Sequence, residues 1–286
     1  MHLFRPLFLL AVFQFLFGSK PLFSQQTFDD EAFKSKPKSE RFSFLLQFPF
    51  SDLDSTGFEQ TYRRLLNVAE LEGDYRSQFA LKFTRCYLAP KRVSQEEEFR
   101  LLDELEKIAA ENELAIEAAV VFHYKTMASF YAQKTAFEPT YVKVLESYRL
   151  FEELGFEKFP PYPLDKMLYR LGKLMFDLED YEPALKFLGV AERYIQPTEK
   201  GWRNYILVLN TIQSIYQHEK EYAKGIGYAQ KILRFAQNFQ TSDPEILKNC
   251  RTWQGISSID IASMLTAQGK FAEGETFANR GYEFVK

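Results

Sequence analysis

The chain has 286 residues, of which 46% are hydrophobic, and its 36 basic side chains against 39 acidic ones give a net charge of −3. Because nucleic-acid binding depends on neutralising phosphates, this balance argues against a nucleic-acid partner. Two cysteines, Cys86 and Cys250, are too few for a disulfide framework. We expect them to be small buried apolar residues rather than a bridged pair.

The first segment has the pattern of a secretory signal peptide. Arg5 precedes an apolar run from Pro6 to Phe17, and the small residue Ser24 before Gln25 offers a cleavage point. The run is shorter than the ~20 residues that a membrane-spanning helix needs. We therefore expect residues 1–24 to be a signal peptide, with an uncleaved anchor as the alternative. No later segment is apolar enough to span a bilayer, so the mature chain is expected in a periplasm or outside the cell.

Residues 25–54 are expected to form an irregular N-terminal segment. Its first part is polar, whereas the stretch from Phe42 to Phe50 is apolar. Because the terminal units of a stacked helical array need a cap, we expect this apolar stretch to lie against the first helices. A partner-binding strand is the alternative.

From Ser55 onward the sequence predicts helices separated by short breaks. No stretch has the alternation of a strand, so the expected fold class is all-α. Gly73 is a favoured left-handed stop, Ser94 and Glu97 form a capping box, and Asp243 before a proline marks a helix start. The predicted helices cover residues 57–72, 75–88, 94–112, 114–133, 139–154, 164–178, 181–195, 199–218, 221–238, 244–268 and 271–286.

A helical-hairpin pattern is clearest between Met167 and Pro197. Leu171–Gly172 lies on the first helix of this hairpin, and Tyr181, Ala184 and Ala191 lie on the second. These residues and spacings resemble the tetratricopeptide repeat (TPR) family. A hairpin of this kind cannot bury its own apolar face and must stack on similar units.

The resemblance extends, more weakly, to other hairpins. Gly225 and Gly274 occupy the place of Ala184, where a small residue lets two helices approach closely. The resemblance therefore implies a TPR-like right-handed α-solenoid over residues 114–286, preceded by degenerate N-terminal helical repeats over residues 55–113.

In this family the first helix of each hairpin lines a concave surface that binds extended peptides. The resemblance therefore nominates eight residues as a binding face, with an ordinary solvated surface as the alternative. They are Lys125 and Ser129, then Tyr169, Lys173 and Phe176, then Asn210, Ser214 and Gln217. The family's best-known carboxylate clamp is not expected, because Tyr169 and Lys173 stand where that clamp has Lys and Asn.

The chain contains no motif for catalysis, metal binding or phosphate binding of the familiar kinds. His123 and His218 are isolated, and the run Glu96–Glu98 begins a helix, where it complements the helix dipole. We therefore expect no enzymatic activity, no catalytic residues, no cofactor and no metal.

The expected function is that of an exported, non-catalytic scaffold that binds a protein or peptide on the concave face of the array. The alternative is the extracytoplasmic sensor region of a bacterial signalling protein whose output domain lies outside this chain, because such regions contain similar helical repeats. Phe277, Tyr282 and Phe284 lie on the last predicted helix with no later helix to cover them. Self-association through this helix is therefore also expected.

Overall fold

The computed structural model describes residues 28–285 except 90, 133–136 and 160–161, so the expected signal peptide lies outside the described residues. Every regular element within them is a helix. In chain order the helices are α2 (Asp30–Ser35), α3 (Lys38–Gln47), η1 (Phe50–Asp52), α4 (Ser55–Leu71), α5 (Tyr75–Tyr87), α6 (Gln95–Glu111), α7 (Ala115–Tyr131), α8 (Phe137–Leu154), η2 (Phe156–Lys158), α9 (Leu164–Asp177), α10 (Tyr181–Tyr194), α11 (Trp202–His218), α12 (Tyr222–Asn238), α13 (Pro244–Ala267) and α14 (Phe271–Val285).

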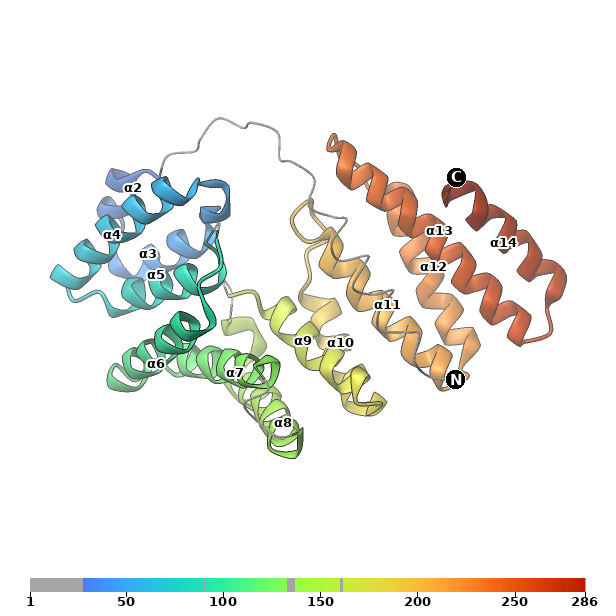
Figure 1. Cartoon of the computed structure of the whole chain (residues 1–286), viewed down its shortest axis with the longest axis horizontal. Coiled ribbons are helices and arrows are strands. Elements are labelled where there is room, and N and C mark those ends of the chain that lie inside the picture. The colour runs from blue at the N-terminus through green and yellow to red at the C-terminus, as the bar shows by residue number, and fades with distance from the viewer. Residues whose placement is uncertain (1–27, 90, 133–136, 160–161, 286) are drawn as a thin grey trace.

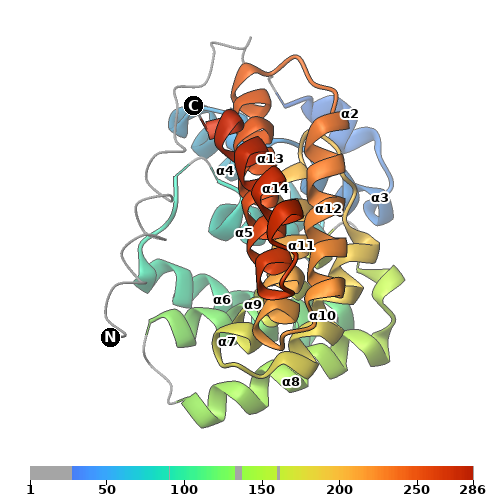
Figure 2. The same cartoon turned by 90° about the vertical axis from the view of Figure 1, so that its right-hand side faces the viewer.

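The helices stack one after another, and the all-α prediction is confirmed. In Figure 1 they follow an arc from α2–α5 at one end, through α6–α8, to α11–α14 at the other. Figure 2 views the molecule from that second end, where α14 lies in front of α13, on which it packs. Among the described residues, no helix has the length and apolar character needed to cross a bilayer.

Local sequence signals placed the helices from α4 onward to within a few residues. Gly73 has a φ of 59° in the turn after α4, and the Asp243 carboxylate accepts backbone amides at the start of α13. The capping box is only half formed. The Ser94 hydroxyl accepts the Glu97 amide at 3.2 Å, whereas the Glu97 carboxylate accepts from Arg85 of α5 at 3.5 Å.

The expectation of an irregular segment over residues 25–54 is wrong where this segment is described. The Asp29 carboxylate caps α2, and α3 packs on α5. Within α3, Phe42 and Leu45 are buried at a helical spacing of three. The many apolar residues around them concealed this spacing in the sequence.

Five helix pairs are closed by the same turn. In each, a residue in the left-handed conformation follows the first helix, and the next residue donates its amide to the carbonyl five positions earlier, as in a Schellman motif. The pairs are α4–α5, α6–α7, α9–α10, α11–α12 and α13–α14, with left-handed residues Gly73, Glu113, Glu179, Lys220 and Gly269 at φ values of 59°, 55°, 60°, 62° and 78°. The corresponding N···O distances are 2.8, 2.9, 3.0, 2.8 and 3.0 Å.

This repeated turn changes the expected grouping of the helices. The predicted boundary between the degenerate repeats (55–113) and the TPR-like array (114–286) falls inside the α6–α7 turn. In this turn Leu114 donates its amide to the Ala109 carbonyl. An array that begins at residue 114 would pair the predicted helices 114–133 and 139–154 as its first hairpin. In the structure α7 closes a hairpin with α6, and α8 stands between this hairpin and α9–α10.

A buried aromatic cluster joins the N-terminal helices to the segment that precedes α9. Tyr162 is only 4% exposed, and its ring centroid lies 5.2 Å from Phe42 of α3 and 5.6 Å from Phe83 of α5. Beside it, the buried Glu117 carboxylate of α7 accepts from Arg76 of α5 at 2.9 and 3.1 Å. The largest apolar core is therefore continuous from the first helices to α11.

Small residues mark the places where helices touch most closely. A Cβ atom added to Gly172 of α9 would lie 2.6 Å from the Leu188 Cγ and 3.3 Å from the Ala184 carbonyl oxygen, both in α10. Ala184 itself is fully buried. A Cβ added to Gly225 of α12 would lie 2.6 Å from the Met264 sulfur of α13. These contacts confirm that Ala184 and Gly225 lie at close helix contacts.

The same Gly→Ala substitution should have opposite effects at two helical positions. Gly189→Ala in α10 should raise the free energy of unfolding by about 0.5–1 kcal/mol, because alanine favours the helix and no atom lies within 4 Å of the added Cβ. Gly172→Ala should lower it by about 1–3 kcal/mol through overpacking against Leu188. Urea unfolding followed by circular dichroism measures both. Equal shifts in the two variants would contradict the close α9–α10 contact.

Candidate functional site

The eight nominated residues lie on α7, α9 and α11, and each is half-buried. They do not form a single surface. The Lys125 ammonium makes ion pairs at 2.8 Å with both Asp103 and Glu106 of α6. Lys125 therefore faces α6 rather than α9, which is a correction to its expected place in a shared groove. Ser129, one helical turn later, is half-buried on the same face of α7.

The nominated residues at the C-terminal end of α9 have partners within the protein. Lys173 makes an ion pair with Asp177, one turn later on α9, and its ammonium lies 5.3 Å from the Phe176 ring centroid. The Phe176 ring packs against Tyr181 of α10 at 6.1 Å and against His218 of α11 at 5.9 Å. Phe176 therefore stabilises the junction of three helices and is not a free anchor.

One polar contact joins a nominated residue of α9 to α11. Burial raises the pKa of Tyr169, and a hydrogen bond with Thr211 of α11 opposes this rise. The Gln217 side-chain oxygen accepts from Gln213 at 3.2 Å. Asn210 and Ser214 lie half-buried on the same helix. The helices α9 and α11 pack together.

Tyr169 also lines a pocket of about 580 Å³ between α5, the start of α6, α7 and α9. This volume lies within the range of roughly 300–1,000 Å³ that is usual for ligand sites. We call it the tyrosine pocket. It is lined by Cys86, Tyr87, Arg92, Val93, Gln95, Glu98, Tyr124, Met127, Ala128, Tyr131, Ala132, Tyr169 and Arg170.

Packed aromatic rings form the floor of the tyrosine pocket. The buried Tyr124 ring lies 4.0 Å from the Tyr87 ring and 5.2 Å from the Phe83 ring, centroid to centroid. The Tyr87 hydroxyl donates to the Glu98 carboxylate at 3.1 Å. Burial raises the pKa of Tyr124 to about 12, so this floor is uncharged at neutral pH. Its rings are held from several sides and are therefore preorganised.

The mouth of the tyrosine pocket combines an exposed ring with a cation. Tyr131, at the end of α7, is 67% exposed. The Arg170 guanidinium carbon lies 5.3 Å from the Tyr124 ring centroid, a distance at which cation and ring attract each other. This arrangement can bind an apolar side chain and an anionic group at neighbouring points.

Sequence reasoning missed most of this pocket. Tyr124 and Tyr131 have the helical spacing of core residues, which predicts that both are packed inside a hairpin. Tyr124 is buried as expected, but Tyr131 is exposed. Arg170 follows Tyr169 directly, and only the packing of α9 near α5 and α7 shows that it reaches the pocket.

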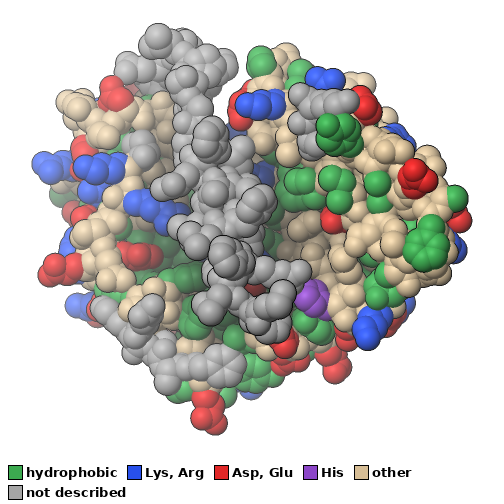
Figure 3. All heavy atoms as spheres, turned by 45° about the vertical axis from the view of Figure 1, so that its right-hand side comes forward, with side chains coloured by type: hydrophobic (Ala, Val, Ile, Leu, Met, Phe, Trp, Pro, Cys, Tyr) green, Lys and Arg blue, Asp and Glu red, His purple; other side chains and the backbone are tan. Residues whose placement is uncertain are grey.

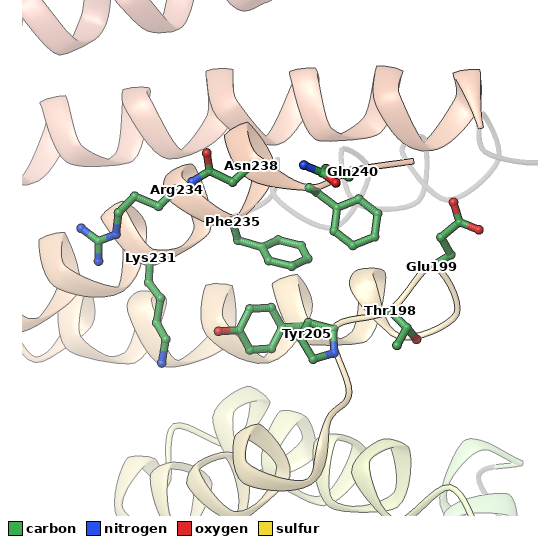
Figure 4. A pocket seen from close by; sticks show the side chains of 10 residues that line it. Thr198, Glu199, Tyr205, Lys231, Arg234, Phe235, Asn238 and Gln240 are labelled. Atoms are coloured by element: carbon green, nitrogen blue, oxygen red, sulfur yellow. The ribbon is translucent and has the colours of Figure 1, made fainter. Parts of the chain in front are cut away.

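A second pocket, of about 600 Å³, lies between α11 and α12. Figure 4 shows Tyr205 and Phe235 at its centre, with Lys231 at one end and Glu199 at the other; the two rings are 5.0 Å apart. Lys231 makes an ion pair with Glu192, and Glu199 accepts from a threonine hydroxyl. Because these charges have partners within the protein, this pocket is the weaker candidate.

Within the described ranges, no three His, Cys, Asp or Glu side chains gather as a metal-binding group. Cys86 and Cys250 are both buried and unpaired, in the helices α5 and α13. The tyrosine pocket therefore has the chemistry of a binding site built from rings, hydroxyls and guanidinium groups.

Comparisons with known proteins support the fold. No protein-family model matches the chain, and no curated protein matches it. Among solved structures, the chain is similar to the crystal structure of BtubC (BKLC) from P. vanneervenii, with a TM-score of 0.53 and 13% sequence identity over 88% of this chain and 92% of that chain. At this identity the similarity concerns the fold alone, a helical-repeat-like arrangement of stacked helices.

The histidine beneath the tyrosine pocket should make the protein acid-sensitive. His123 is fully buried, and burial, together with the nearby Arg170, lowers its pKa from 6.5 to about 3. Below pH 6.5 the unfolded chain takes up a proton that the folded chain does not. The free energy of unfolding should therefore fall by roughly 1.4 kcal/mol per pH unit as the pH drops from about 6 to 4.

His123→Leu should remove this loss, and urea unfolding at several pH values measures it. His218→Leu, at the exposed end of α11, is the control and should keep the wild-type slope. If His123→Leu also keeps that slope, the histidine is protonated in the folded protein.

Proposed function

We propose that the chain is a non-catalytic scaffold that binds an extended segment of a partner protein. The observation that carries this proposal is the exposed Tyr131 beside Tyr169 and Arg170 at the mouth of a pocket. Tyrosine and arginine are the side chains that most often dominate protein-binding surfaces. No nucleic acid, cofactor or catalytic step is part of the proposed function.

We further propose that the stacked helices form a TPR-like right-handed α-solenoid whose concave face includes the tyrosine pocket. The five equivalent hairpin turns support this, because repeated units stacked on one another are expected to close in the same way. The contact of Gly172 with Ala184 and Leu188 supports it as well. The apolar run behind Arg5 supports export to a periplasm or to the outside of the cell.

The exposed rim of the tyrosine pocket favours a peptide segment over a small rigid cofactor. Residues of α5, α6, α7 and α9 line its volume of about 580 Å³. Exposed side chains such as Arg92 and Tyr131 form its rim. An extended segment could place one side chain on the Tyr124 floor while its backbone crosses this rim. Met127 at the floor would adapt to different side chains, since methionine is flexible and polarisable.

Tyr131→Ala should weaken peptide binding at least about tenfold, because truncating an aromatic anchor typically costs 2 kcal/mol or more. The probe is a set of dodecapeptides selected from a random display library on the immobilised full chain, with dissociation constants measured by fluorescence polarisation. The melting temperature should stay unchanged, since the Tyr131 side chain is mostly exposed.

Tyr75→Ala is the matched control, because Tyr75 is 49% exposed at the start of α5 and lies outside the pocket lining. It should bind the peptides as the wild type does. A library that yields no binding peptide, or equal losses for the two variants, would count against a peptide-binding pocket.

Self-association through α14 is a second part of the proposal. Gly274 and Gly281 are buried against α13, whereas Phe271 and Tyr282 are 68% and 58% exposed. In Figure 3 apolar side chains are scattered among polar ones over the C-terminal helices. Phe271 and Tyr282 fall on one face of α14 by the helical period, and we propose that this face forms the contact.

The double variant Phe271→Glu with Tyr282→Glu should shift the mass measured by light scattering toward that of a monomer. Like charges on a shared face would repel across the contact. Leu247→Glu, at an exposed position near the start of α13, is the control and should leave the mass unchanged. A wild-type chain that is monomeric at every concentration would refute self-association.

A further inference from the structure

Two arginines of the tyrosine pocket differ from several other arginines of the chain. Arg41, Arg76 and Arg85 each make an ion pair with a glutamate. For Arg170 and Arg92, by contrast, no carboxylate of the described residues lies within the 4.0 Å that defines an ion pair. Arg170 is half-buried in α9, and Arg92 is exposed before α6. The pocket thus contains cationic groups whose charge is not neutralised by the protein.

The acidic side chain in the pocket lining is hydrogen-bonded to a neighbouring lining residue. Glu98 of α6 accepts the Tyr87 hydroxyl at 3.1 Å. On the α9 side, Arg170 influences Tyr124, His123 and Tyr131 electrostatically. The positive charge of Arg170 acts more strongly than Asp165 at Tyr124 and more strongly than Asp177 at Tyr131. Arg170 therefore attracts an anionic group between these two rings.

We propose that the tyrosine pocket recognises an aspartate or glutamate side chain that lies next to an apolar or aromatic residue in the partner. This specificity rests on the proposed peptide-binding function. The carboxylate pairs with the guanidinium of Arg170, and Arg92 adds a second positive charge at the rim. The neighbouring apolar side chain packs against Tyr124, Tyr131 and Met127. The partner is thus an extended segment with a local acidic–apolar motif.

The packing of Arg170 suits this role. Its guanidinium lies over the Tyr124 ring, which Phe83 and Tyr87 hold in place. Stacking orients the planar group before the ligand arrives, so less side-chain entropy is lost on binding. A guanidinium also matches a carboxylate through two parallel hydrogen bonds, which gives directional specificity as well as affinity.

The attraction must be local, because the whole chain carries a net charge of −3. An acidic partner is not drawn to the protein by its overall field, and only the surroundings of Arg170 and Arg92 favour it. Binding should therefore weaken as salt screens this contact. The apolar contact on Tyr124 should be far less sensitive to salt.

The test uses dodecapeptides displayed with their C-termini tethered, so that all their free carboxylates are side chains. Peptides selected on the full chain should be enriched in Asp or Glu beside an apolar residue. For a selected peptide, the twin with Asn or Gln in place of the acid should bind the wild type about tenfold more weakly, as expected for loss of a charge-assisted hydrogen bond.

Arg170→Gln should bind the acidic peptide about tenfold more weakly than the wild type and should no longer distinguish it from its neutral twin. Arg251→Gln is the matched control, because Arg251 is exposed on α13 outside the pocket. It changes the net charge equally and should keep full discrimination. If Arg170→Gln fails to fold, Arg92→Gln at the exposed rim should still reduce the discrimination between the twins.

The outcomes separate this inference from the proposed function. Peptides that depend on Tyr131 but show no acidic enrichment, or bind as well as their neutral twins, overturn the acidic specificity and leave peptide binding in place. A library that yields no binding peptides contradicts both. Unchanged discrimination in Arg170→Gln and Arg92→Gln also overturns the assignment, because another cation must then recognise the acid.

Discussion

A left-handed residue at each hairpin turn is the constraint on which the stacked array depends. It lets the chain reverse within three residues, and the hydrogen bond from the next amide to the carbonyl five positions earlier fixes the angle between the helices. Glycine adopts this conformation freely, but Glu113, Glu179 and Lys220 do so at a cost of about 1 kcal/mol or more each. Packing between the two helices must offset that cost. Close contacts such as that of Gly172 with Ala184 and Leu188 therefore stabilise the hairpins together with the turns.

The tyrosine pocket lies where this regular pattern is interrupted. Hairpins α6–α7 and α9–α10 are separated along the chain by α8, and the described residues between α8 and α9 do not form a turn of the repeated kind. The chain then crosses back through the segment that contains Tyr162, whose ring packs among residues of α3 and α5. This crossing places the start of α9 near α5 and α7, and their ends enclose the pocket. A departure from strict repetition thus produces the candidate site, while the regular hairpins provide its rigid frame.

Much of the fold could be predicted from local sequence signals, and most of the site could not. Gly73 and Asp243 have fixed local roles, so the helices that they bound were recognisable. Glu113, Glu179 and Lys220 carry no such signal, because glutamate and lysine rarely adopt a left-handed φ. Tyr131 has the spacing of a core residue, and only the position of α9 makes it a pocket residue. The sequence suggested that Lys125 lies on a face shared with residues of α9 and α11. Its ion-pair partners, Asp103 and Glu106, lie on α6.

Amide hydrogen exchange on the full chain, with and without a saturating selected peptide, tests most directly whether the tyrosine pocket is the binding surface. The account predicts slower exchange at the C-terminal half of α7, the N-terminal half of α9 and the start of α6, where the peptide would cover or rigidify the backbone. It predicts no change in α12. Slower exchange confined to α11 and α12, around the second pocket, with none in α7 or α9, would contradict it.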